Sequence, residues 1–371
     1  MSHRTTMPQR QRTCPSRCLK EMPAALVTAW ILALVPNGSA TPTIIANDAI
    51  WRDLNGNEIH AQGGSMLTLG GTYYWYGFDG DPPQPGSDVP RYKAVNCYSS
   101  HDLSNWRFEG AVLTDHAPNR LDVLFCEETK TFVMLTKEMD SAMRGEDVGA
   151  GIAISATANG AFVRCGKLEL PDSIGGGDQS VFVDDDGKAY IVYTPWARNP
   201  TTGKIETNRH LICAELTPDF RHIARVVCKM LNTRLEAPAI FKRNGKYYWM
   251  ASQVAWWYSS ATSWCMASRL EGPWTPWQKL ASARPPSDPL AQQMLFDSYN
   301  SQHDFVLRVQ GTQSVSYIYC GDRYSNFTTF GVGRVVWLPL NFTGETPTLE
   351  WHQKWSVDAS RGSWFAPREE P

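Results

Sequence analysis

The 371-residue sequence lacks several patterns that would assign its chemistry directly. It has no GxSxG motif, so nothing marks the nucleophilic serine of an α/β-hydrolase. It has no CxxC pair and no regular spacing among its eight His, so we predict no metal site. It also lacks a charge excess, because 35 Lys and Arg oppose 37 Asp and Glu. This balance gives no attraction to nucleic acid or to acidic membranes, and we expect neither as a partner.

The N-terminal 40 residues differ from the rest of the sequence. Residues 1–20 contain five Lys and Arg and no acidic residue, and residues 24–35 are mostly apolar. Small residues follow at Gly38 and Ala40. This order is typical of a secretory signal peptide, and the apolar run is short for a membrane span of about 20 residues. We expect residues 1–40 to be removed, residues 41–371 to form one domain, and the protein to be extracellular; an uncleaved anchor is the alternative.

The cysteines and glycosylation motifs are compatible with export. Seven cysteines follow residue 40, so at least one thiol stays unpaired, and the sequence does not determine the pairing of the others. Asn-Phe-Thr triplets begin at Asn326 and Asn341, which are predicted glycan sites.

A repeat of about 58 residues runs through the mature sequence. Five apolar hairpins share a turn position, and the steps between these positions are 59, 57, 58 and 66 residues. The turn residues are Gly71, Lys130, Gly187, Gly245 and Gly311. Two further strand-like segments follow each hairpin, with no long amphipathic helix. Five four-stranded units predict an all-β, five-bladed β-propeller, in which residues 44–58 add a strand to the last blade. A β-sandwich is the alternative, but it does not explain the period.

One polar residue stands at the start of each hairpin. Counting back nine residues from each turn Gly, or eleven from Lys130, reaches the same kind of side chain every time. These five residues are Gln62, Asn119, Asp178, Glu236 and Gln302. Because the first strand of each blade lines the central channel, we expect them to converge on one pocket. A carboxyl group among apolar walls there has a raised pKa, so we predict that Glu236 is a general acid.

Several motifs resemble those of one enzyme family. They are "HAQGG", "DQSVFVDDDGKAYIVY", "RLEAPAIFKRNGKYYWMAS", "NSQHDFVL" and "YCGDRY". Together they look like glycoside hydrolase family 43, and most closely its exo-β-1,3-galactanase subfamily, over nearly all of the mature chain. The resemblance implies a five-bladed propeller and inverting hydrolysis of a glycosidic bond by an acid and a base.

The resemblance also implies roles for individual residues. Glu236 falls on the acid of the family, and Asp178 on the Asp that orients substrate and tunes that acid. The first hairpin reads "HAQGGS" and lacks the Asp that is the usual base. In the galactanase branch a Gln is thought to serve instead, through an imidic-acid tautomer, and this residue corresponds to Gln302.

Two positions depart from the galactanase pattern. Asn119 stands where that branch has a Glu close to the sugar, and Gln62 stands where it usually has a His. Asp115 and Asp122 are nearby acids, but neither is in register. From the resemblance as a whole we still predict exo-acting, inverting hydrolysis of β-1,3-galactan or a related plant polysaccharide. The alternatives are a catalytically silent carbohydrate-binding propeller and, ranked lowest, a protein-interaction propeller.

Further residues are candidates for binding the polysaccharide. Asn119, Gln62, Trp256, Trp257 and Asp322 are predicted to contact substrate; the two Trp could instead pack beneath a loop, and Asp322 could pair with Arg323. Residues 184–186 are three Asp before a Gly, which fits a solvated turn better than a calcium loop. No cofactor is predicted, and we expect a monomer.

Overall fold

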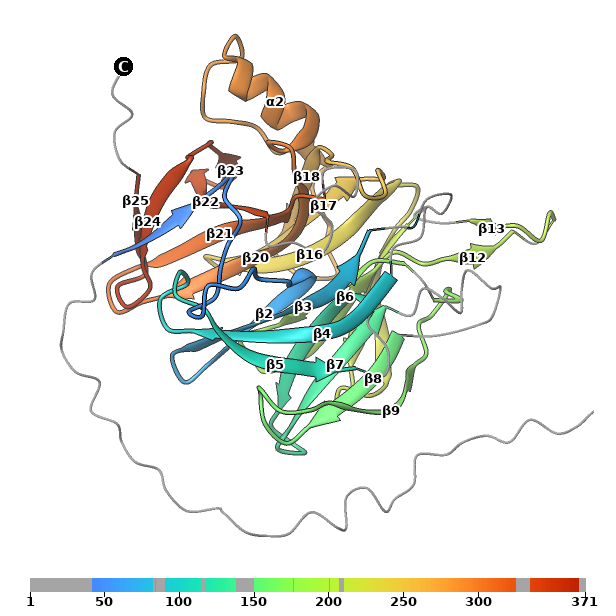
Figure 1. The fold of residues 1–371 in the computed structure, drawn as a ribbon. Helices are drawn as coiled ribbons and strands as arrows, with labels where there is room; N and C mark the ends of the chain where they lie inside the picture. The colour runs from blue at the N-terminus through green and yellow to red at the C-terminus, as the bar shows by residue number, and fades with distance from the viewer. Residues whose placement is uncertain are drawn as a thin grey trace, which may run out of the picture. The chain divides into compact units, whose positions relative to one another are not determined.

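The computed structural model describes residues 42–366 except 83, 85–90, 115–117, 138–149, 176, 200, 207–209 and 325–333. Across these residues the chain is all-β, with a single helix, α2 (Pro289–Asp297), inserted before the last large sheet (Figure 1). Asp288 caps this helix by accepting a hydrogen bond from the Leu290 N–H. No helix in the described part of the chain has the length and apolar character needed to cross a bilayer.

Five antiparallel sheets have four strands each, and the strands of each sheet follow one another along the chain, except that a small separate hairpin interrupts the third. The first is β2 (Gln62–Leu69), β3 (Thr72–Asp81), β4 (Arg91–Ser100) and β5 (Arg107–Leu113). The second is β6 (Asn119–Cys126), β7 (Thr131–Lys137), β8 (Ala150–Ser155) and β9 (Val163–Leu168). The third is β10 (Gln179–Val183), β11 (Ala189–Tyr193), β14 (Leu211–Leu216) and β15 (Ile223–Met230). The fourth is β16 (Leu235–Arg243), β17 (Lys246–Gln253), β18 (Thr262–Ala267) and β19 (Gln278–Lys279). The fifth is β20 (Gln302–Gln310), β21 (Val315–Asp322), β22 (Val335–Thr343) and β23 (Thr346–Leu349).

A sixth sheet corrects the predicted count of blades. β1 (Thr43–Ala46) pairs with β24 (Lys354–Asp358), which pairs with β25 (Ser363–Phe365), so both ends of the described chain meet in one three-stranded sheet. In Figure 1 the blue β1 lies beside the red β24. The propeller is therefore six-bladed, and the prediction of five blades is wrong. β1 also does not join the fifth sheet, as was expected of residues 44–58. A separate small hairpin, β12 (Ala197–Arg198) with β13 (Ile205–Glu206), extends from the third sheet.

Hydrophobic side chains fill the spaces between neighbouring sheets. One core cluster joins the first and second sheets, and further clusters join the second to the third, the third to the fourth, and the fourth to the fifth. A fifth cluster closes the circle, because it contains Trp75 of the first sheet, Trp337 of the fifth, and Ile45 and Trp355 of the sixth. Burial of these large side chains is what holds the blades face to face.

The hairpin turns agree with the repeat found in the sequence. Gly71, Gly187 and Gly245 have φ of 77°, 82° and 73°, a left-handed conformation that Gly adopts without steric cost. Lys130, the copy without Gly, takes the same conformation at φ 55°. The first strands of the five large sheets, β2, β6, β10, β16 and β20, lie next to one another, and the N-terminal ends of β6, β10, β16 and β20 face a common pocket.

Candidate active site

An open pocket lies where the large sheets begin. The cavity itself is small, with a volume of about 70 Å³. Four of the five polar residues expected to converge here do line it. The lining residues are Asn119, Arg120, Lys137, Asp178, Trp196, Glu236, Val254, Trp256, Trp257, Gln302 and Tyr324. None of them belongs to β1, β24 or β25. The sixth sheet therefore closes the fold without contributing to the pocket.

β-bulges set the direction of the side chains at the strand starts. The ladders of β2, β6 and β16 shift register directly after Gln62, Asn119 and Glu236. The next residue has a positive φ in each case: Gly63 at 59°, Arg120 at 61° and Ala237 at 50°. A bulge bends the strand and re-aims its side chains. For Arg120 and Ala237 the conformation is strained, and such strain is found mainly where a site requires it.

Glu236 is a buried acid at the pocket wall. Its side chain is held by the Ala255 N–H at 2.9 Å and by Nε2 of Gln302 at 3.3 Å, and both groups donate to Oε1. Burial, reinforced by the negative charge of Asp178, raises the pKa of Glu236 from 4.5 to about 8. The prediction of a raised pKa is confirmed. At neutral pH the Glu236 carboxyl group is therefore protonated in most molecules, as a general acid must be.

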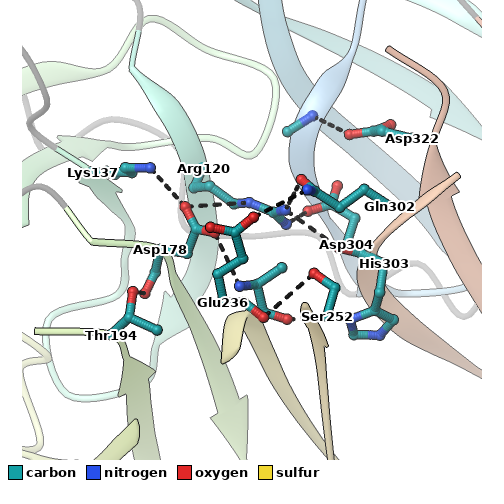
Figure 2. A network of polar contacts seen from close by, with 12 residues as sticks. Arg120, Lys137, Asp178, Thr194, Glu236, Ser252, Gln302, His303, Asp304 and Asp322 are labelled. Atoms are coloured by element: carbon teal, nitrogen blue, oxygen red, sulfur yellow. Dashed lines mark hydrogen bonds and ion pairs between the residues drawn. The ribbon is translucent and has the colours of Figure 1, made fainter. Parts of the chain in front are cut away.

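Asp178 stays ionised beside it. Burial alone would raise the pKa of Asp178, but Lys137 and Arg120 together outweigh burial and lower it to about 2. Lys137 Nζ lies 2.6 Å from Oδ1, and the Ala237 N–H donates to Oδ2 at 3.0 Å (Figure 2). A Cβ on the preceding Gly177 would lie 1.5 Å from the Thr194 carbonyl oxygen, so only Gly allows this approach. Two neighbouring carboxyl groups with pKa values pushed apart are typical of acid–base sites.

Gln302 connects the acid to the loop at the pocket mouth. Its Nε2 donates to the Trp256 carbonyl oxygen at 3.0 Å as well as to Glu236. Its Oε1 accepts from Nη2 of Arg120 at 3.4 Å. These contacts fix which end of the amide is nitrogen and which is oxygen.

Arg120 is the central cation of the network. Figure 2 shows its guanidinium between Asp178 on one side and Gln302 and Asp304 on the other. Burial disfavours its charge, but Asp304 and Asp178 more than compensate, so the pKa of Arg120 is raised. Nη2 also donates to the His303 carbonyl oxygen at 3.3 Å. The guanidinium thereby links its own strand, β6, to the start of β10 and to the start of β20.

Comparison with known proteins agrees with this geometry. Residues 62–339 match the family described as glycosyl hydrolases family 43. The chain belongs to glycosyl hydrolases family 43. Since the match covers three quarters of the sequence, the chain is a glycoside hydrolase, and the resemblance to this family is confirmed. No curated protein sequence gives a match.

Solved structures place the chain near one branch of family 43. An exo-β-1,3-galactanase from Clostridium thermocellum is 30% identical, with a TM-score of 0.72 over 87% of this chain and 68% of that one. An exo-β-1,3-galactanase from Phanerochaete chrysosporium, solved with galactose, is 28% identical, with a TM-score of 0.71 over 88% and 71%. A variant of that fungal enzyme, solved with β-1,3-galactotriose, is 28% identical, with a TM-score of 0.71 over 87% and 70%.

In this family 43 chain the loop after β17 carries two neighbouring Trp side chains that have different surroundings. Trp256 lines the pocket and is 65% exposed, so its ring is available to a ligand. Trp257 is 7% exposed and packs edge-to-face on Tyr324 with ring centroids 5.1 Å apart. Trp257 therefore packs beneath the loop, although it also lines the pocket, and the sugar-platform role of Trp256 stays a prediction.

Two residues predicted to contact substrate do not line the pocket. Gln62 is fully buried and donates to the carbonyl oxygens of Arg323 and Arg334, both at 3.3 Å. Asp322 is buried and accepts from the Gly63 N–H at 2.6 Å and the Tyr324 hydroxyl at 2.9 Å. Both lie behind the pocket and support its walls. Arg323, considered as the partner of Asp322, forms an ion pair with Asp48.

Arg120 and Lys137 line the pocket but were not predicted from the sequence. Lys137 stands directly opposite Asn119 in the β6–β7 ladder. Counting seven residues forward from Lys130 reaches it, and the same count from Gly245 reaches Ser252, opposite Glu236. The repeat therefore held a signal for Lys137. Arg120 had none, because only the bulge turns a residue next to Asn119 into the same pocket.

Carboxylates near the pocket do not form a metal centre in the described residues. No group of three or more His, Cys, Asp or Glu there is arranged to hold an ion. The acidic run at 184–186 forms a turn, and Asp184 pairs with Lys242 Nζ at 2.6 Å and accepts from the Tyr247 hydroxyl at 2.6 Å.

Proposed function

We propose that the protein is an exo-acting, inverting hydrolase of β-1,3-galactan or of a closely related plant polysaccharide. The observation that carries this proposal is a buried, protonated Glu236 beside an ionised Asp178 in an open pocket. The similarity to exo-β-1,3-galactanases supports galactose as the terminal sugar. A pocket at the end of the channel suits the end of a chain, and the protein is proposed to act as a monomer.

Glu236 acts as the general acid. Because Oε1 accepts two hydrogen bonds, we assign the acidic proton to Oε2. Protonation of the glycosidic oxygen lets the leaving sugar depart as a neutral alcohol, and charge then develops on the carboxylate. Such proton transfer contributes typically about 10²–10⁴-fold to the rate.

Gln302 positions the attacking water. With a sugar bound between Gln302 and Glu236, which are in direct contact at 3.3 Å in this structure, Oε1 of Gln302 can accept a hydrogen bond from a water molecule on the face opposite the leaving group. The Arg120 N–H on Oε1 favours the ordinary amide, in which oxygen is the stronger acceptor. Attack from that face inverts the configuration at the anomeric carbon.

Asp178 acts through the acid. Its charge keeps the pKa of Glu236 high, and its Oδ2 holds the bulge that aims Glu236. Asn119, which also lines the pocket, offers an amide to sugar hydroxyl groups, in place of the Glu that the galactanase branch carries.

Hydrolysis of β-1,3-galactotriose by wild type and by Glu236→Gln tests the proposal. We expect galactose release to fall about 10²–10⁴-fold in the variant, because Gln has no proton to donate. Proton NMR of the wild-type reaction is expected to show α-galactose as the first anomer. If neither protein releases galactose while both bind galactotriose, the site is a binding site and the alternative of a silent propeller holds.

Export is a separate proposal, supported by the basic and apolar character of residues 1–40. N-terminal sequencing of secreted protein is expected to begin after Ala40, and recovery of an intact N-terminus would contradict this. We also propose glycans at the two triplets. Asn341 is a partly exposed residue of β22, whereas Asn326 lies outside the described residues.

A further inference from the structure

Two cysteines face each other across neighbouring strands of the third sheet. Cys213 of β14 and Cys228 of β15 are direct partners in the antiparallel ladder. Direct partners project from the same face of the sheet, with Cα atoms about 4.5–5.5 Å apart. Disulfides span Cα distances of about 4.4–6.8 Å, so the backbone at this position needs no rearrangement to accept one.

The two thiol groups already interact. A side-chain hydrogen bond joins them and, together with burial, raises the pKa of Cys213. Cys213 is fully buried, whereas Cys228 is partly exposed. An oxidant in solution therefore meets Cys228 first, and the interior thiol is in place for a second step.

We propose that Cys213 and Cys228 form a disulfide when the protein meets a disulfide donor such as oxidised glutathione. The Cys228 thiolate attacks the donor, forms a mixed disulfide and releases one thiolate. Cys213 then gives up its proton, attacks the Cys228 sulfur and displaces the second thiolate. Two protein thiols and one donor disulfide become one protein disulfide and two donor thiols, so electrons and protons balance.

The position of this bond has a structural consequence. β15 is the outermost strand of its sheet, and its ladder with β14 shifts register directly after Cys213 and again after Glu215. Edge strands with irregular pairing are the ones that separate most easily. A bond closing the 14 residues between the two cysteines stabilises the fold mainly by restricting the unfolded chain.

A third thiol makes the test selective. Cys265, on β18 of the next sheet, is buried close enough to Cys228 for their charges to interact. It is not a ladder partner of either cysteine, since it lies opposite Trp249. The proposal thus requires a Cys213–Cys228 disulfide and excludes a Cys228–Cys265 disulfide.

Peptide mapping decides between the pairings. Wild-type protein secreted from a eukaryotic host would be alkylated, digested with trypsin without reduction, and analysed by mass spectrometry. We expect residues 210–221 linked to residues 226–229, and separation of the two on reduction. Recovery of both peptides alkylated, or of 226–229 linked to 247–269, would overturn the proposal.

A stability measurement provides an independent readout. Cys228→Ser is expected to lower the Tm by about 4 °C, and reduction of wild type by dithiothreitol by a similar amount. After that reduction, wild type and Cys228→Ser should melt together. The control is Cys165→Ser, a partly exposed cysteine on the outer strand β9 of the neighbouring sheet, which should retain the sensitivity of wild type to dithiothreitol. A Tm of wild type that reduction leaves unchanged contradicts the disulfide.

Discussion

Asp178→Asn tests whether Asp178 controls the protonation of Glu236. The substitution keeps the size of the side chain and an oxygen that can accept from the Ala237 N–H, but it removes the negative charge. It also leaves the Lys137 ammonium, now 2.6 Å from Oδ1, without its carboxylate partner. Asp178 raises the pKa of Glu236 and Lys137 lowers it, so both changes act in the same direction and lower that pKa.

The expected loss of activity at pH 7 follows from the change in the pKa of Glu236. Its rise from 4.5 to about 8 corresponds to about 5 kcal/mol in favour of the neutral form, most of it from burial. A neighbouring charge contributes about 1–3 pK units; since burial is the larger cause here, we assign about 1–2 units to Asp178 and expect a pKa between about 6 and 7 in the variant. At pH 7 the protonated fraction of Glu236 then falls from about nine tenths to between about one half and one tenth. This change alone lowers the rate about two- to tenfold.

The assay is the pH dependence of kcat/KM on β-1,3-galactotriose. Wild-type activity is expected to decline as pH rises through about 8, where Glu236 loses its proton. In Asp178→Asn this alkaline limb should move to lower pH. The deficit of the variant should therefore be smaller at pH 5, where Glu236 is protonated in both proteins.

The matched control is Asp184→Asn. Asp184 forms the same kind of pair, with Lys242 Nζ at 2.6 Å, but it follows the far end of β10, about 20 Å from Asp178 along the strand. This variant should keep the alkaline limb of wild type. A folded Asp178→Asn protein with an unmoved limb would refute the reasoning, because Glu236 would then be tuned by burial alone.

Three further substitutions test other parts of the site. Lys137→Met removes a charge that lowers the pKa of Glu236, so its alkaline limb should move to higher pH in the same assay. Trp256→Ala removes the exposed ring at the pocket mouth, and we expect KM for galactotriose to rise about 3–10-fold while kcat changes less than twofold; an unchanged KM rules out the platform. Arg120→Lys cannot maintain the forked contacts to Asp304 and its neighbours, and urea denaturation should show a loss of about 3 kcal/mol; a loss below about 1 kcal/mol contradicts a central role.

The local order of the sequence was enough to predict the hairpins and the acid. Turn residues with positive φ between two apolar runs produce four of the hairpins, at Gly71, Lys130, Gly187 and Gly245, wherever the chain runs afterwards; the fifth, at Gly311, forms without a positive φ at that position. The equal offset from those turns made Asp178, Glu236 and Gln302 candidates for one pocket, and they line it together. Both signals depend on neighbours within about 20 residues, which a single sequence displays.

The number of blades and the network of polar contacts in the pocket depend on contacts between residues that are far apart in the sequence. β1 meets β24 more than 300 residues away, and no local pattern shows that these two short strands form a sheet of their own. The bulge after Asn119 turns Arg120 inward to reach Asp304, 184 positions further on. Gln62 shared the register of the others, yet the fold turned it to carbonyl groups behind the wall. Periodicity specifies which residues begin a strand, whereas packing between strands decides which of them face the pocket.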